Sequence, residues 1–346
     1  MELRSIKWDG RCAEIIDQRE LPSKLVFRRL CSLEEFADAI KTMKVRGAPL
    51  IGITAAYGVV AHVKAVKPEN YDELVREADR AVEILKATRP TAVNLFKALQ
   101  RVRSAIDPAG MIEENVYRME STAVEIDREE EEMCRLMGEH GAGVIEKPSA
   151  RVMTICNTGF LATSGIGTAL GVIYTAHEMG KIERVFALET RPVLQGARLT
   201  MWELLQRKVP AYLITDNTAA AVMDRIGIDY IFVGADRIAA NGDTANKIGT
   251  LMLAILAHRF GVPFYVVAPS STIDPNCPNG REIPIEQRDK NEVIRVMGCQ
   301  IAPAEADAIN FAFDVTPASL ITGIITEKGV FRPENIMEAI RDRQLR

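Results

Sequence analysis

Short apolar runs alternate with helical patterns along the second half of the chain. Apolar strands are predicted at residues 152–155, 184–188, 211–214, 230–233 and 264–268, with two further candidates at 311–315 and 320–325. Helical spacing fills the gaps, at residues 167–179, 197–206, 218–225 and 244–260. Strands that alternate with helices of this length are typical of a parallel, doubly wound sheet. The pattern therefore predicts an α/β domain over residues 149–346.

The first part of the chain is mostly helical after residue 30. Residues 2–30 alternate loosely and contain the turn signals W-D-G and L-P-S, so we expect small antiparallel strands there. A helix is predicted over residues 33–45, with Ser32 as its N-cap and Glu35 at its third position. Pro49 is suited to open a second helix, which is rich in small residues and is expected to pack closely.

Three longer helical patterns follow, over residues 71–87, 92–106 and 111–141. Pro90 ends the first, because the residue before a proline is forced out of the helical conformation. The last carries the charge run D-R-E-E-E-E, typical of a solvated face, and is expected to connect two domains. With the linker at residues 146–149, the predicted domains are 1–148 and 149–346.

Composition excludes several classes of protein. A net charge of −4 gives no electrostatic footprint for nucleic acid or for an anionic membrane. Gly, Asp or Arg interrupts the longest apolar runs within a dozen residues, so we expect no membrane-spanning segment. The first ten residues lack the apolar core of a signal peptide, which favours a cytoplasmic protein.

Six cysteines are scattered along the chain, at positions 12, 31, 134, 156, 277 and 299. They form no C-x-x-C motif and no cluster with histidine, which argues against a zinc site and against a disulfide framework. A reducing cytoplasm fits this pattern, and a thiol can stay free for chemistry there.

Residues 151–171 are the strongest candidate for a functional site. A buried strand is predicted to lead into a polar, glycine-containing loop that begins with Cys156 and then into a helix. Such an arrangement offers backbone N–H groups to an anion. A lone cysteine at this place is more often a buried apolar residue, but the following N-T-G favours a reactive thiol, and both readings stay open.

Other candidates also follow predicted strands, where parallel sheets bind ligands: Glu189, Thr190, Arg191, Thr215, Asp216, Asp236 and Ala268. Asp236 is read either as a helix cap or partner of Arg237, or as a general acid in a dry pocket. Asn246 and Lys247 are predicted near the start of a helix, and Gln195 in a loop before one, where they suit sugar hydroxyls or a phosphate.

Two arginines precede predicted helices in the first part of the chain. Arg46 is read as a surface arginine, the interpretation that its position favours, or as a phosphate clamp beside a helix N-terminus. Arg89 has the same placement and is a weak signal by itself. The proline-rich segment 270–289 is too long for a simple connector and is a candidate lid.

Gly165, Gly167 and Gly171 resemble a dinucleotide-binding fingerprint, with Glu189 at the end of the next strand. That fingerprint follows its strand immediately, whereas residues 156–164 intervene here and the spacing is G-x-G-x-x-x-G. The pattern therefore disfavours a nicotinamide-dependent dehydrogenase.

Several motifs, in order, resemble the methylthioribose-1-phosphate isomerase family, which shares a superfamily with the regulatory subunits of the translation-initiation guanine-nucleotide exchange factor. They are R-G-A-P-L-I-G, R-P-T-A-V-N-L, C-N-T-G-F-L-A-T, G-I-G-T-A-L-G, E-T-R-P-V-L-Q-G-A-R-L-T and G-A-D-R-I-A-A-N-G-D-T-A-N-K-I-G-T. The resemblance implies a small, mostly helical N-terminal domain on a Rossmann-like domain. It also implies a homodimer without metal or cofactor.

The resemblance assigns roles to individual residues. Cys156 matches the catalytic cysteine and Asp236 the proton donor. The positions that match substrate contacts are Arg46, Gly47, Ala48, Arg89, Gln195, Asn246 and Lys247. Two positions depart from the family pattern. Ile155 stands where the family usually has histidine, which removes a titratable neighbour and makes the pocket drier, and Phe160 stands where a smaller residue is common, which is expected to reshape the pocket for the sugar's 5-substituent.

The implied reaction converts 5-methylthioribose 1-phosphate to 5-methylthioribulose 1-phosphate in methionine salvage. The anomeric phosphate blocks spontaneous ring opening, so the ring oxygen must be protonated, and hydrogen must move from C2 to C1. Cys156 would abstract the C2 proton in an enolate route, or stabilise charge during a direct hydride shift; we hypothesise the hydride shift, because Ile155 makes the site drier.

Two alternatives remain. One is an isomerase for 5-deoxyribose 1-phosphate or ribose 1,5-bisphosphate, although no surplus basic cluster for a second phosphate is evident. The other is a non-enzymatic regulatory subunit, which has no need for both Cys156 and Asp236.

Overall fold

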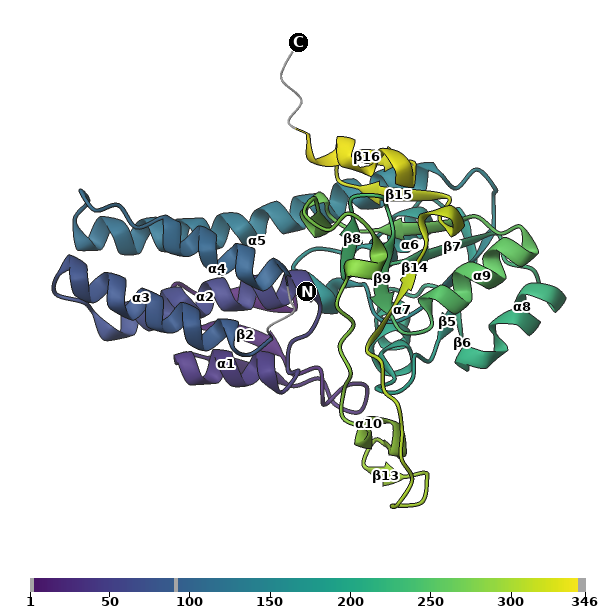
Figure 1. Ribbon diagram of the computed structural model, residues 1–346, viewed down its shortest axis with the longest axis horizontal. Coiled ribbons are helices and arrows are strands. Elements are labelled where there is room, and N and C mark those ends of the chain that lie inside the picture. The colour runs from purple at the N-terminus through teal and green to yellow at the C-terminus, as the bar shows by residue number, and fades with distance from the viewer. Residues whose placement is uncertain (1–2, 90–92, 342–346) are drawn as a thin grey trace, which may run out of the picture. The chain divides into compact units, whose positions relative to one another are not determined.

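The computed structural model describes residues 3–89 and 93–341 (Figure 1). Its internal contacts divide the chain into two compact units, one of residues 1–133 with 160–167, the other of residues 134–159 with 168–346. This division crosses the long helix, whereas the sequence placed the boundary after residue 148. We describe each unit by itself.

The first unit combines a small sheet with helices, as the sequence predicts. Strands β1 (Ile6–Trp8), β2 (Ala13–Ile16) and β3 (Phe27–Leu30) form an antiparallel sheet in that order. The helices are α1 (Leu33–Lys41), α2 (Ala48–Val66), α3 (Tyr71–Lys86), α4 (Val93–Ser104) and the first part of α5 (Ile112–Gly143). The predicted helical segments are thus confirmed, while Pro90 and the predicted helix start at residue 92 lie outside the described residues.

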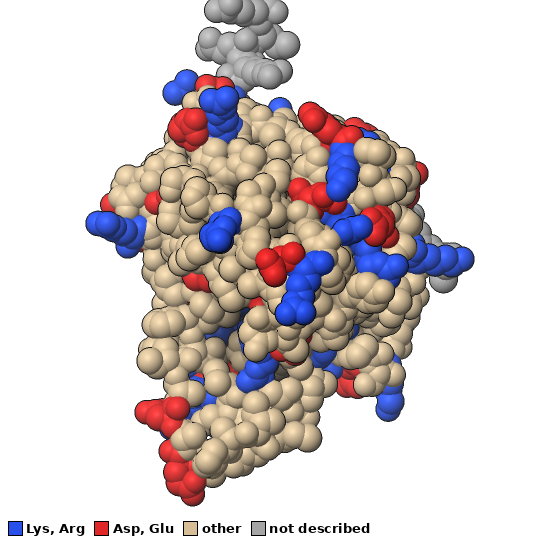
Figure 2. Space-filling model, turned by 90° about the vertical axis from the view of Figure 1, so that its right-hand side faces the viewer, with Lys and Arg blue, Asp and Glu red and all other residues tan. Residues whose placement is uncertain are grey.

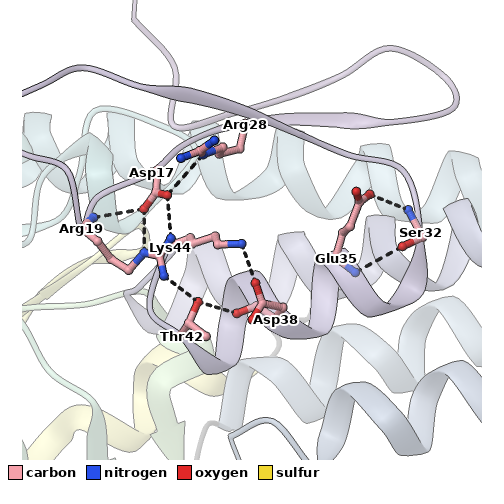
Figure 3. Close-up of polar contacts among 8 residues, drawn as sticks. All are labelled: Asp17, Arg19, Arg28, Ser32, Glu35, Asp38, Thr42 and Lys44. Atoms are coloured by element: carbon pink, nitrogen blue, oxygen red, sulfur yellow. Dashed lines mark hydrogen bonds and ion pairs between the residues drawn. The ribbon is translucent and has the colours of Figure 1, made fainter.

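Local signals in the sequence define the start of α1. The Ser32 side chain accepts a hydrogen bond from the Glu35 N–H, and the Glu35 carboxylate accepts one from the Ser32 N–H (Figure 3). This capping box satisfies two backbone donors that helix formation leaves unpaired. The predicted cap is therefore confirmed, although α1 ends at Lys41, four residues before the predicted end.

Helix α2 forms the centre of the first unit's core. Its residues 50–61 are all buried, and nearly all of them are apolar. Among the described residues, α2 is the one helix long and apolar enough to cross a membrane, and 72% of its most apolar window is buried inside the protein. This helix does not contradict the expectation of no membrane-spanning segment, which stays a prediction.

One expectation about the cysteines is wrong. Cys12 and Cys31 form a disulfide, with their Cα atoms 4.5 Å apart. Antiparallel pairing of β2 with β3 sets Ala13 opposite Leu30, so the residues just outside this pair, Cys12 and Cys31, also face each other. The absence of a C-x-x-C motif says nothing about cysteines that strand pairing brings together from 19 residues apart.

The second unit contains a seven-stranded sheet in the order β16-β15-β10-β7-β4-β5-β6. The strands are β4 (Ala150–Thr154), β5 (Ile182–Leu188), β6 (Ala211–Ile214), β7 (Tyr230–Val233), β10 (Phe264–Val267), β15 (Gly323–Thr326) and β16 (Gly329–Phe331). All neighbouring strands are parallel except β16, which is antiparallel to β15. The order runs outward from β4 through β5 and β6, then resumes on the other side of β4 with β7 and β10, so the strand order reverses between β4 and β7.

Helices connect these strands as expected for an α/β fold. They are α6 (Ala169–Glu178), a π-helical turn η2 (Gly196–Thr200) that continues into α7 (Met201–Gln206), α8 (Ala219–Arg225) and α9 (Thr250–Phe260). Apolar side chains of α8, α9 and the central strands form one core cluster, which includes Met153, Ile231, Val266 and Leu253. The predicted doubly wound, mainly parallel sheet is therefore what the second unit contains.

A second, four-stranded sheet was not predicted. It contains β11 (Ile273–Asp274), β8 (Arg237–Ala239), β9 (Thr244–Lys247) and β14 (Phe313–Thr316), in that order. The predicted helix start at residue 244 is wrong, because residues 244–247 pair with β14 and β8, and α9 begins only at Thr250. The candidate lid, residues 270–289, contains β11 and the short turns η4 (Ser270–Thr272) and η5 (Gly280–Glu282).

The remaining elements are short helices, turns and one hairpin. They are α10 (Asn291–Ile294), the hairpin of β12 (Arg295–Val296) and β13 (Cys299–Gln300), and the turns η1 (Phe160–Ala162), η3 (Asp216–Thr218), η6 (Ala318–Leu320) and η7 (Pro333–Ile340).

On the face shown in Figure 2, Lys and Arg side chains are interspersed with Asp and Glu. That face therefore presents no extended patch of one charge.

A buried carboxylate after β2 provides a test of the first unit's stability. The Asp17 side chain is fully buried and accepts hydrogen bonds from the Arg19 Nε at 2.9 Å and Nη2 at 2.8 Å, while Arg28 lies 3.5 Å away (Figure 3). Burial acts to raise the pKa of Asp17, but the hydrogen bonds and charge of Arg19 outweigh it and hold the pKa below its ordinary value.

We expect Asp17→Asn to destabilise the protein by about 1.5–3 kcal/mol at pH 7, the range for hydrogen bonds to charged groups. A lowered folded-state pKa stabilises the fold above the unfolded value of about 4, and this contribution disappears as the pH falls through the folded pKa. Thermal unfolding of wild type and variant should therefore differ most at neutral pH and converge as the pH falls below the folded-state pKa of Asp17. Asp38→Asn, which removes a half-exposed carboxylate paired with Lys44, is the control and should cost under about 1 kcal/mol. A gap that widens in acid would contradict the interpretation.

Candidate active site

Cys156 follows β4 in an uncommon backbone conformation. Its φ angle is +65°, in the left-handed region that costs a residue with a Cβ about 1–2 kcal/mol. Two threonine hydroxyls hold it there. The Cys156 N–H donates to Thr190 Oγ1 at 2.8 Å, and Thr200 Oγ1 donates to the Cys156 carbonyl at 2.5 Å. The side chain is buried, with 8% of the residue exposed.

The ends of three successive strands are connected beside Cys156. Thr190, which follows β5 and also has a positive φ, donates its N–H to Asp216 Oδ1 at 2.8 Å, and Arg191 donates its N–H to Asp216 Oδ2 at 2.7 Å. Asp216 follows β6. The carboxyl edge of the sheet thus brings Cys156, Thr190 and Asp216 together, as the sequence predicts.

Asp236 follows β7, the strand on the other side of β4. The loops after these two strands pack closely, because a Cβ added to Gly234 would lie 2.8 Å from Thr158 Cγ2. Asp236 is half-buried and its N–H donates to the Ala245 carbonyl at 2.9 Å. Arg237 forms its ion pair with Asp274 at 3.6 Å, so this arginine does not account for the acid beside it.

The position of Cys156 and Asp236 in the sheet is informative. They follow the two adjacent parallel strands, β4 and β7, between which the strand order reverses. In open α/β sheets this is the point where loops diverge and a ligand crevice forms. The two residues therefore flank the place where such a fold binds small molecules.

Asn246 and Lys247 lie at the end of β9, four and three residues before α9 begins at Thr250. The predicted placement near the start of a helix is therefore confirmed, although both residues are in a strand. Asn246 is buried and donates to Thr250 Oγ1 at 3.0 Å, whereas the Lys247 ammonium donates to the Ala312 carbonyl at 2.9 Å and lies over the Phe313 ring. The loop that follows packs against the residue before Cys156, because a Cβ added to Gly249 would lie 3.0 Å from Ile155 Cδ1. This loop is thus close to the Cys156 strand.

Asp314 is a residue that the sequence analysis missed. It faces Asn246 across the β14–β9 pair, and its carboxylate accepts the N–H groups of Gly249 at 2.7 Å and Leu251 at 3.0 Å. Burial raises the pKa of Asp314, although these backbone hydrogen bonds act against the increase. Asp314 therefore fixes the loop between Lys247 and α9, and only pairing with the distant β14 places it there.

Gln195 immediately precedes the π-helical turn η2. It is 8% exposed, and its Oε1 has no hydrogen-bond partner among the described residues. A buried amide oxygen without a partner costs free energy, so it is suited to accept a hydrogen bond from a bound hydroxyl. The geometry fits the role predicted for Gln195. Thr200 and Glu203 lie further along the same continuous helix, and the sequence analysis singled out neither.

The other predicted contacts belong to the first unit. Arg46 and Arg89 are half-buried, before α2 and after α3. Gly47 has a φ of +94°, and a Cβ there would lie 2.4 Å from the Ala162 carbonyl oxygen, so the turn before Ala48 requires glycine. The structure does not test whether these four residues contact a ligand.

Within residues 3–89 and 93–341, no group of three or more His, Cys, Asp or Glu side chains is arranged to hold a metal ion. The expectation of a reaction without metal or cofactor stays a prediction.

The chain is similar to characterised families along almost its full length. It is 51% identical over 342 residues to the methylthioribose-1-phosphate isomerase of Aquifex aeolicus, covering 99% of this chain and 72% of that protein. It is also 51% identical over 329 residues to that of Geobacillus kaustophilus, covering 95% and 92%. The chain belongs to the methylthioribose-1-phosphate isomerase family. The family model of the initiation factor 2 subunit family also matches residues 44–333.

Solved structures agree with this assignment. The 5-methylthioribose 1-phosphate isomerase of Pyrococcus horikoshii superposes with a TM-score of 0.92 at 42% identity, over 98% of this chain and 96% of that one. A protein described as translation initiation factor eIF-2B, subunit delta, from A. fulgidus superposes with a TM-score of 0.87 at 41% identity, over 97% and 98%. The isomerase family therefore shares its fold with initiation-factor subunits.

We expect Thr190→Val to release Cys156 from its left-handed conformation. Valine keeps the volume but leaves the buried Cys156 N–H without its acceptor, at a cost of about 1–3 kcal/mol. The melting temperature should fall, and the alkylation of Cys156 by iodoacetamide, followed by peptide mass spectrometry, should become faster. Thr175→Val, which removes a hydroxyl bonded only within α6, is the control. Alkylation at the wild-type rate in both variants would refute the role given to Thr190.

Proposed function

We propose that this chain is the isomerase that converts 5-methylthioribose 1-phosphate to 5-methylthioribulose 1-phosphate in methionine salvage. Membership of the family supports this reaction, since two proteins named methylthioribose-1-phosphate isomerase are each 51% identical to this chain. The observation that carries the proposal is the placement of Cys156 and Asp236 after the two strands that flank the reversal of strand order.

Cys156 and Asp236 take separate roles in this proposal. Neutral Asp236 donates a proton to the ring oxygen, which opens the furanose and leaves an oxocarbenium-like C1. Hydride then moves from C2 to C1 while the C2 hydroxyl loses its proton, so that one proton enters and one leaves. Cys156, which follows β4, stabilises the positive charge and accepts that proton.

Substrate contacts follow the predicted set. Gln195, Asn246 and Lys247 in the second unit offer an amide oxygen, an amide and an ammonium. For Arg46, Gly47, Ala48 and Arg89 of the first unit, the proposal keeps the role of substrate contacts that the resemblance implies, since arginines and backbone N–H groups suit a phosphate. Ile155, which is buried beside Cys156, keeps this side of the site apolar.

A regulatory subunit is the alternative that one observation favours. The chain is as similar to the protein described as an eIF-2B subunit as it is to the archaeal isomerase, at 41% and 42% identity. A scaffold protein has no use for a strained cysteine with an acid on the neighbouring strand, and this is why we prefer the enzyme.

We also infer a homodimer, as the family resemblance implies, and a cytoplasmic location. The edge strand β6 exposes Tyr212 and Leu213, and an apolar sheet edge is a surface that oligomers commonly cover. The Cys12–Cys31 disulfide removes the support that the scattered cysteines gave to a reducing compartment.

The purified full chain should turn over 5-methylthioribose 1-phosphate faster than 5-deoxyribose 1-phosphate or ribose 1,5-bisphosphate. Cys156→Ala and Asp236→Asn should each lower kcat by about 10²–10⁴-fold, the usual contribution of a positioned acid or base. Cys299→Ala, which removes an exposed thiol, is the control for the cysteine variant. No turnover of any of the three sugars by wild type would favour the regulatory subunit.

The route of hydrogen transfer is tested in deuterated water. A direct hydride shift should give product with no solvent deuterium at C1, whereas an enolate formed by Cys156 exchanges its proton before C1 receives one. Product incubated without enzyme corrects for exchange beside the ketone. Substantial enzyme-dependent deuterium at C1 would rule out the hydride shift.

A further inference from the structure

A fully buried carboxylate lies directly beneath the Cys156 loop. Glu203, on α7, has no exposed surface. Its Oε1 accepts a hydrogen bond from Asn157 Nδ2 at 2.7 Å, and its Oε2 accepts one from the Tyr174 hydroxyl at 3.1 Å. Burial and the charge of Glu203 raise the pKa of Tyr174 well above its usual value, so its hydroxyl stays a donor.

The loop after Cys156 packs closely against the Glu203 carboxylate. Asn157 directly follows Cys156, and a Cβ added to Gly159 would lie 1.9 Å from Glu203 Oε2. Only glycine permits that approach, so residues 157–159 and Glu203 fit one another closely. A buried charge is a costly way to fill space, because an apolar residue of the same volume would avoid its desolvation.

Thr200 connects Glu203 to Cys156. Thr200 and Glu203 are three positions apart on the continuous η2–α7 helix and therefore lie on the same face of it. Thr200 Oγ1 donates to the Cys156 carbonyl at 2.5 Å and accepts from Asn157 Nδ2 at 3.3 Å. Asn157 thus bridges Thr200 and Glu203. This bridge holds the peptide group between Cys156 and Asn157, and so keeps Cys156 in its positive-φ conformation.

We propose that Glu203 is a positioning residue for Cys156, acting through Asn157 and Thr200 to keep the cysteine backbone left-handed and its thiol in place. Glu203 lies against the loop and acts on the reaction through these two side chains rather than by touching the substrate. The inference rests on the proposed function for its effect on turnover, but its effect on the thiol does not depend on any substrate.

Glu203→Gln tests this role, because glutamine keeps the size and one acceptor but loses the charge and the second acceptor. We expect kcat to fall about 10–100-fold, as for a small misplacement of a reacting group, with KM within about 2-fold. Alkylation of Cys156 by iodoacetamide, measured by peptide mass spectrometry across pH 6–9, should be at least about 3-fold faster at a given pH. Asn157→Ala should behave alike, and the double variant should be no worse than the more impaired single variant.

Glu178→Gln is the matched control. Its exposed carboxylate pairs with Arg207, whose guanidinium lies over the Tyr174 ring, so it adjoins the same cluster without touching the loop. Wild-type kcat and alkylation are expected for it. If Glu203→Gln does not fold, Tyr174→Phe removes one hydrogen bond to Glu203 and should shift both measurements in the same direction, to a smaller extent.

The outcomes separate the two hypotheses. A Glu203→Gln protein with a lower melting temperature, but with wild-type kcat and thiol alkylation, would overturn the positioning role and leave Glu203 as a packing residue. If wild type turns over none of the three sugars, the proposed function fails, and the alkylation profiles still decide for or against Glu203.

Discussion

The pair of hydrogen bonds that fixes the backbone of Cys156 is the constraint on which the site depends. A cysteine with φ of +65° relaxes unless its surroundings hold it. Thr190 binds its N–H from the end of β5, and Thr200 binds its carbonyl from the π-helical turn. The π turn, a rare form often seen at functional sites, places Thr200 and Glu203 on the face that meets the loop.

The sheet supplies the larger frame. Parallel strands align their carboxyl ends, so Cys156, Thr190 and Asp216 lie along one edge, each linked to the next by hydrogen bonds. Asp236 joins them from the other side of β4 because β7 is added beside β4 and not beside β6. Four residues widely separated in the chain are thus arranged by strand order alone.

Much of this arrangement could be predicted where the signal is local. The capping box of Ser32 and Glu35 and the apolar run of β7 need only their own neighbours in sequence. Residues 244–247 were misread because their partner, β14, lies about 70 positions away, and pairing overrides a helix-like pattern. Glu203 was missed for a similar reason: a single acid in M-W-E-L-L looks like a surface residue until Asn157 and Tyr174 surround it. Arg46 and Arg89 were weak signals that only resemblance made specific.

The Cys12–Cys31 bond means that sulfur occurs in two oxidation states within one polypeptide. One pair is joined across the ends of β2 and β3, while Cys156 stays a thiol, almost wholly shielded from solvent. The disulfide and the thiol need opposite redox conditions, because a reductant that keeps the Cys156 thiol reduced also reduces the Cys12–Cys31 bond. Burial protects Cys156. A thiol that oxidants cannot easily reach stays reduced even under conditions in which Cys12 and Cys31 are oxidised to a disulfide.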